Sequence, residues 1–149
     1  MADTNQQDID IVNTLIAKTL DSAEGYREAA RDEETGRYRD TFLKMADERD
    51  AVVNHLQTTV QGLGGTPKER GSILGSMHRT FTFFSAITTK GDDTLIKRVE
   101  GGEDSLRDAY RDALEKDMDA VTRQAVTEAN ISVMNGHRMM SDLKHLTEV

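Results

Sequence analysis

Four glutamates are the side chains of this sequence best placed to share one chemical task. Glu24 and Glu48 lie at nearly equal distances before and after a predicted turn at residues 35–36, so they should lie at similar heights on two antiparallel helices. Glu103 and Glu128 are placed comparably around a second predicted turn. In four-helix bundles that bind two metal ions, carboxylates at one level of the bundle supply the oxygen ligands. The four glutamates are therefore candidate metal ligands.

The histidines of such a two-metal site are missing. Two-metal bundles combine a Glu from each of two helices with a Glu-x-x-His motif from each of the other two. The third residue after Glu48 is Ala51, and the third after Glu128 is Ile131. We therefore expect no bound cofactor and no stoichiometric di-iron centre. The alternative is a cation such as iron or manganese that the clustered acids hold weakly.

Arg49 interrupts the apolar stripe of the second predicted helix. Its neighbours on that stripe are Phe42, Met45, Val52 and Leu56. At about 100° per residue Arg49 falls near the midline, whereas the four glutamates fall on the flanks of their own stripes. A buried cation is costly unless it is paired. We expect Arg49 to be mostly buried and bonded to a glutamate or a helix carbonyl, and the glutamates to be solvated on the helix flanks.

The elements that must position these side chains are four long helices, which apolar residues at alternating spacings of three and four predict. The first covers about residues 8–33 and the second about residues 38–63, where Gly64-Gly65 followed by Pro67 ends it. The third carries an apolar face from Leu95 to Ala113, and the fourth from Val121 to Leu146.

Residues 66–90 separate the second helix from the third. Ser72 is a candidate cap for a short helix in this segment, and its apolar face would include Met77 and Phe81. A helix of ~25 residues is ~38 Å long, so a connection of this size can return the chain along the bundle. The sequence therefore predicts one all-α domain over residues 1–149, a four-helix bundle with a long crossover that carries a short extra helix. Residues 1–7 are predicted as a flexible N-terminus.

Composition narrows the range of partners. The 27 acidic and 19 basic residues give a net charge of −8, which argues against nucleic acid as a partner because phosphate binding favours a basic face. The sequence has no Cys, which excludes disulfides and thiolate metal sites. No run approaches the ~20 apolar residues of a membrane helix, so no membrane partner is expected. The polar N-terminal residues resemble no signal peptide, and the expected compartment is the cytoplasm.

A second apolar set, formed by Val126, Val133 and Met140, lies on the flank of the fourth helix. The expected core face of that helix is instead formed by Val121, Ala125, Ala129, Ser132, Gly136, Met139, Leu143 and Leu146. The flank could receive the crossover helix or form a subunit interface. Phe83, in the crossover, could likewise be buried in the bundle or lie at a subunit interface. Because a contiguous exposed apolar patch is unusual, we expect a homo-oligomer, and a symmetric dimer is the commonest form.

Four stretches of the chain resemble a known bacterial family. They are residues 21–30 (DSAEGYREAA), 71–79 (GSILGSMHR), 100–114 (EGGEDSLRDAYRDAL) and 137–146, and the third is the most specific. The family consists of uncharacterised four-helix-bundle proteins, a domain of unknown function in the ferritin-like superfamily. The resemblance spans nearly the whole chain and implies a ferritin-like fold. On the superfamily's metal pattern this sequence retains Glu24, Glu48 and Glu103 at best.

Two functional hypotheses remain. The first is a non-enzymatic bundle that acts through self-assembly or through a protein partner, with stress physiology as the candidate process. The alternative is a degenerate ferritin-like carboxylate protein that binds iron or manganese and has weak or unusual redox activity. Protection of DNA is disfavoured by the acidic balance.

Overall fold

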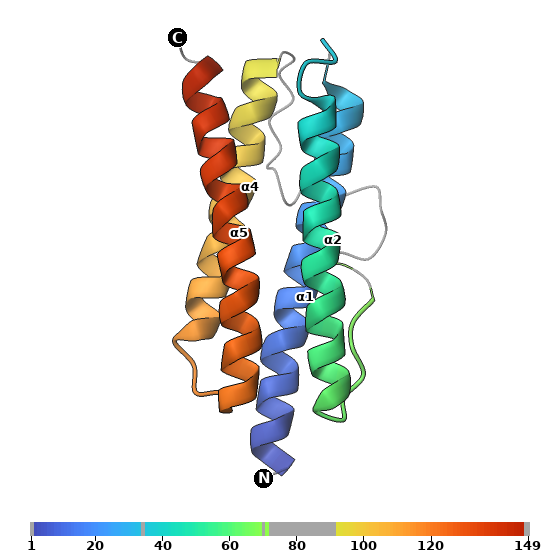
Figure 1. Cartoon of the computed structure of the whole chain (residues 1–149), viewed down its shortest axis with the longest axis vertical. Coiled ribbons are helices and arrows are strands. Elements are labelled where there is room, and N and C mark those ends of the chain that lie inside the picture. Colours follow the sequence, from blue (N-terminus) through green and yellow to red (C-terminus); the bar gives the residue numbers. More distant parts are fainter. Residues whose placement is uncertain (1, 34, 70, 72–91, 148–149) are drawn as a thin grey trace.

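The computed structural model describes residues 2–33, 35–69, 71 and 92–147, and within them it contains four long helices. These are α1 (Ala2–Asp32), α2 (Arg39–Gly62), α4 (Asp92–Leu114) and α5 (Ala120–Thr147). They lie side by side as one elongated bundle (Figure 1). No strand occurs in the described residues, so the predicted all-α class is confirmed.

The order of the helices identifies the type of bundle. In Figure 1 α1 and α2 run in opposite directions, α4 runs parallel to α2, and α5 returns alongside α4. The chain therefore passes from one end of the bundle to the other between α2 and α4. This is the predicted bundle with one long crossover, the ferritin-like arrangement. The short extra helix expected in the crossover, with Phe83, lies outside the described residues.

The helix ends follow the predicted turn chemistry. Gly36 (φ 76°) lies in the turn between α1 and α2, and Gly64 (φ 83°) follows the end of α2. The Gly65 amide donates to the Val60 carbonyl and the Gly64 amide to the Gln61 carbonyl, both at 3.0 Å, as in a Schellman ending. The left-handed backbone at Gly36 and Gly64 explains why glycine occupies both positions.

The first helix begins at Ala2, earlier than its expected start near residue 8. Asp8 supplies a reason, because its side chain is fully buried and anchors this end of α1. Its Oδ2 accepts hydrogen bonds from the Thr122 hydroxyl at 2.9 Å and from the Asp119 amide at 3.2 Å. Most of the segment expected as an N-terminal extension is therefore helical.

The described start of the crossover runs along α1 in the direction of that helix. Gly65 lies against Ile9, and the Asn13 side chain then donates to the Thr66 carbonyl and accepts from the Lys68 amide. Gly71 lies farther along α1, where a Cβ atom would meet the Asp21 carboxylate. These contacts set the crossover on its path toward the far end of the bundle.

The core consists of two apolar clusters, one nearer each end of the bundle. The first, here the Leu56 cluster, is formed by Ile11, Val12, Leu15, Ile16, Val52, Val53, Leu56, Val60, Leu106, Tyr110, Ala113, Val126, Ala129 and Val133. The second, here the Phe42 cluster, is formed by Tyr26, Ala29, Ala30, Tyr38, Phe42, Met45, Ala46, Val99 and Met140. Buried polar side chains lie where the two clusters meet.

The interpretation of α5 was wrong in one respect. Val126, Val133 and Met140 were expected on a surface flank, but they are 0%, 0% and 1% exposed and belong to the core. Val121 and Met139, expected in the core, are 70% and 38% exposed. Both stripes obey the helical spacing and share small residues, so periodicity alone left the rotation of α5 undetermined by one position.

Candidate functional site

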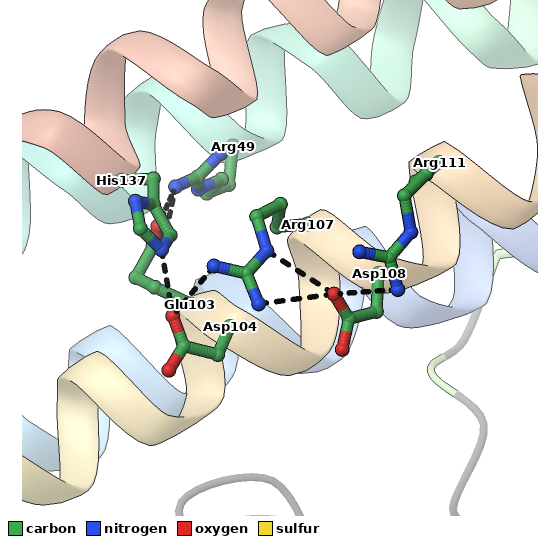
Figure 2. Close-up of polar contacts among 7 residues, drawn as sticks. All are labelled: Arg49, Glu103, Asp104, Arg107, Asp108, Arg111 and His137. Carbon is green, nitrogen blue, oxygen red and sulfur yellow. Dashed lines mark hydrogen bonds and ion pairs between the residues drawn. The ribbon is translucent and has the colours of Figure 1, made fainter.

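An ion pair between Arg49 and Glu103 crosses the centre of the bundle. Arg49 belongs to α2 and Glu103 to α4, and each of these helices packs against α1 and α5. Since α2 and α4 lie diagonally opposite, a contact between them passes through the bundle axis. Arg49 Nη2 donates to both oxygens of Glu103, at 2.6 Å from Oε2 (Figure 2). The two side chains are 1% and 0% exposed.

The other two helices complete this centre. Tyr26 of α1 is fully buried, and its hydroxyl interacts with both partners of the pair. Gly136 of α5 lies directly against the guanidinium. A Cβ atom at this position would lie 2.7 Å from Arg49 Nη2 and 2.5 Å from Met45 Cε. Glycine therefore leaves the space that the guanidinium occupies.

Burial and charge act in opposite directions on the pair. Burial raises the pKa of Glu103 above its ordinary value, although the attraction of Arg49 and the hydrogen bond from Tyr26 lower it. Burial alone would lower the pKa of Arg49, but the charge of Glu103 and the contact with Tyr26 raise it. The guanidinium therefore stays charged, and the buried carboxylate depends on it.

A second buried polar contact adjoins the pair on α1 and α4. The Thr19 hydroxyl donates to the Leu15 carbonyl at 2.6 Å, so the Tyr110 hydroxyl, 2.8 Å away, donates to Thr19. Burial raises the pKa of Tyr110 to about 12. Thr19 and Tyr26 lie on the same stripe of α1, and Glu103 and Tyr110 on the same stripe of α4. Tyr26 belongs to the Phe42 cluster and Tyr110 to the Leu56 cluster, so each cluster contributes a hydroxyl to this buried polar region.

A chain of polar contacts follows the surface of α4 beside the buried pair (Figure 2). His137 Nε2 of α5 lies 2.7 Å from Asp104 Oδ1, and the two side chains are 17% and 45% exposed. Arg107 lies 3.4 Å from Asp104 and 3.1 Å from Asp108, which Arg111 also approaches at 3.2 Å. His137 thus connects α5 to α4 beside the buried pair.

The four candidate glutamates share no single site. Glu103 is bonded to Arg49, and Glu24 lies 3.6 Å from Arg27. Glu48 and Glu128 line an open groove of about 510 Å³ between α2 and α5, where Glu128 lies 3.5 Å from His55. Within the described residues, no group of three or more Asp, Glu or His side chains is arranged to hold a metal ion.

The expectation that all four glutamates are solvated was wrong for Glu103. Between Leu95 and Ala113 the helical spacing fits a stripe through Gly102 and Ala109, and it fits one through Glu103 and Tyr110 equally well. The structure buries Val99, Glu103, Leu106, Tyr110 and Ala113. The need of Arg49 for a carboxylate was the signal that could have selected this stripe.

The fold and this centre define the class of protein, a ferritin-like four-helix bundle. Two solved structures share the fold over nearly the whole chain. One is a mutant of Dps1 from Mycobacterium smegmatis, with a TM-score of 0.81 and 10% identity over 97% of this chain and 99% of that one. The other is a ferritin-like, diiron-carboxylate protein from Bacillus anthracis, with a TM-score of 0.63 and 14% identity over 99% of this chain and 97% of that one.

The family follows from the sequence match. Residues 7–116 match the model of the domain of unknown function DUF2383, so the chain belongs to that family. This confirms the resemblance found in the sequence. A search of the curated proteins gave no match. In the part of the chain that is described, no helix has the length and apolar character needed to cross a membrane.

Proposed function

We propose that this protein is a non-enzymatic helical bundle that acts through self-assembly or through a protein partner. The observation that carries the proposal is the Arg49–Glu103 pair at the bundle axis. In ferritin-like di-metal carboxylate bundles the metal ligands project into the bundle core, and here the Arg49 side chain occupies that position. The surface of the bundle is then the part available for function.

The residues at the axis do not fit a pair of metal ions. A two-metal site in this fold draws carboxylates from all four helices and imidazoles from two of them. At this axis Glu103 is the carboxylate, and both its oxygens already accept hydrogen bonds from Arg49. The guanidinium would also repel a metal cation at this short range. No step of a reaction is therefore assigned to a metal here.

Exposed apolar side chains on α5 support a role in association. Val121 is 70% exposed, Ile131 58% and Met139 38%. Met139 borders the groove between α2 and α5, whose floor includes the buried Val52 and Ala129. Large apolar side chains at a groove are typical of contact surfaces. We propose a homodimer, because it is the commonest symmetric assembly, and the cytoplasm as its compartment.

Light scattering coupled to size exclusion tests the assembly. We expect the wild type to have the mass of a dimer, and the double substitution Ile131→Glu and Met139→Glu to shift it to the monomer because two charges would be buried at the contact. Ser105→Glu, which adds a charge to an exposed position of α4, is the matched control and should leave the dimer intact. A monomeric wild type at high protein concentration would reject self-assembly.

Iron oxidation tests the non-enzymatic part. When ferrous iron is added without oxygen and the sample is then exposed to air, we expect oxidation no faster than in buffer. The alternative is a weak metal-binding carboxylate protein using iron or manganese, and the shared groove of Glu48, His55 and Glu128 is the observation that favours it. Rapid oxidation that Glu48→Ala abolishes would establish that alternative and overturn our proposal.

A further inference from the structure

We propose that the centre of the bundle is a cation-binding site that the chain fills with its own Arg49 side chain. A chain that lacks this side chain would take up a small external cation there, and guanidinium would bind better than a divalent metal. This inference goes beyond the proposed function, because it assigns a class of ligand to the Glu103 pocket. It holds whether the protein assembles or not.

The first argument is charge. Glu103 is 0% exposed, and both its oxygens accept hydrogen bonds from Arg49. Within the described residues, His137 is the other basic side chain that acts on this carboxylate, and it lies beside Asp104 rather than on Glu103. A buried carboxylate that loses its partner must take up a proton or another cation. Removing the Arg49 side chain therefore creates a demand for positive charge at the axis.

The second argument is shape. The missing Cβ of Gly136 leaves room beside the guanidinium, since that atom would lie 2.7 Å from Arg49 Nη2 and 3.3 Å from Cζ. Tyr26 approaches the pair from α1 and interacts with both of its partners. Arg49→Ala would leave a cavity that matches a flat guanidinium ion and ends at the carboxylate. A planar ion with a fork of donors fits a carboxylate better than a spherical one does.

The third argument concerns the number of ligands. The oxygen atoms that could act as ligands around the Arg49 guanidinium are those of the Glu103 carboxylate and the Tyr26 hydroxyl. Calcium takes six to eight oxygen ligands, and the transition metals favour imidazole or thiolate, whereas the imidazole of His137 is bonded to Asp104 and the chain has no Cys. The described part of the chain offers no third Asp, Glu or His to join such a set. Guanidinium instead needs one carboxylate and a flat cavity.

The test is the melting temperature of Arg49→Ala in guanidinium chloride at millimolar concentrations, far below those that denature proteins. Sodium chloride and manganese chloride at the same ionic strength are the reference salts. We expect the variant to melt well below the wild type. Guanidinium at about ten times its Kd should raise its melting temperature by about 3–6 °C. The wild type should not respond, because its site is already filled.

The double variant Arg49→Ala with Glu103→Gln is the matched control, since it keeps the cavity and removes the charge. It should show no guanidinium response. An equal response of both variants, or a larger response to manganese, would overturn the proposal. If Arg49→Ala alone does not fold, guanidinium that restores its folding and not that of an unfolded double variant supports the proposal, and failure to restore it overturns the proposal. Iron oxidation by the wild type would refute the proposed function and leave this result unchanged.

Discussion

The two pairs that join α2 to the second half of the bundle have similar chemistry and different surroundings. Arg49 and Glu103 meet at the axis and are 1% and 0% exposed, whereas His55 and Glu128 meet at the outer groove and are 50% and 55% exposed. Each pair joins a basic side chain of α2 to a glutamate. At the axis, water cannot hydrate one partner when the other is removed, whereas at the groove water can hydrate either partner. Burial therefore decides which pair the structure depends on.

The largest expected difference between the two pairs is the loss of stability when the basic partner of each is removed. We expect Arg49→Ala to lower the free energy of unfolding by about 3–5 kcal/mol, because it leaves Glu103 buried without its partner. His55→Ala should change it by less than about 0.5 kcal/mol, since both partners of that pair are half exposed. Urea denaturation measures both values. Equal losses would show that the guanidinium reaches water after all.

Two glycines test how closely the axis is packed. Gly136→Ala should destabilise the protein by about 1–3 kcal/mol, because the new methyl group meets Met45 and the fixed guanidinium of Arg49. Gly101 of α4 has no atom within 4 Å of the Cβ position, so Gly101→Ala is its matched control. That change should stabilise the helix by about 0.5–1 kcal/mol. Thermal melts of both variants give the comparison, and a stable Gly136→Ala would mean that the centre has free space.

The pH dependence of Glu103 gives a smaller and finer test. Burial raises the pKa of Glu103 above its ordinary value of 4.5, so the folded chain binds this proton more tightly than the unfolded chain. The stability gained from this tighter proton binding is thus fully present below pH 4.5, and it is lost as the pH rises through the pKa of Glu103 in the folded chain. The stability of the wild type relative to Glu103→Gln should fall by about 1.4 kcal/mol for each pH unit between 4.5 and the folded pKa.

Urea titrations over a series of pH values measure that difference. Glu128→Gln, at the exposed groove, is the control and should show a much flatter profile than Glu103→Gln. A difference between wild type and Glu103→Gln that grows with pH would have the opposite sign. It would show that the attraction of Arg49 outweighs burial.

Much of the fold could be predicted from local patterns. The spacing of apolar residues located the helices, and the glycines near residues 36 and 64 located two turns, because such signals depend on neighbours in sequence. The crossover followed from the length of residues 66–90 against the length of a helix. The rotation of α5 could not be predicted, since Ala125, Ala129 and Gly136 are too small to show which adjacent residues share their face.

The centre was only half predictable. Arg49 stood out because a charged residue on an apolar midline has few explanations. Glu103 did not, because a glutamate beside a stripe is ordinarily solvated and its burial depends on a guanidinium 54 positions away. Tyr26 and Tyr110 lay on stripes, but their hydroxyl contacts depend on how four helices meet. The local spacing of residues along the chain does not indicate long-range pairing of this kind.

Asp8 couples the start of the first helix, α1, to the start of the last helix, α5. Its carboxylate, on the second turn of α1, accepts hydrogen bonds from the Asp119 amide and the Thr122 hydroxyl at the start of α5. Helix ends usually fray independently, in openings that cost little free energy. Here the first turn of α5 cannot keep these bonds once α1 unwinds past Asp8. Amide hydrogens at the two places should therefore exchange with solvent as one unit, although more than a hundred residues of chain separate them.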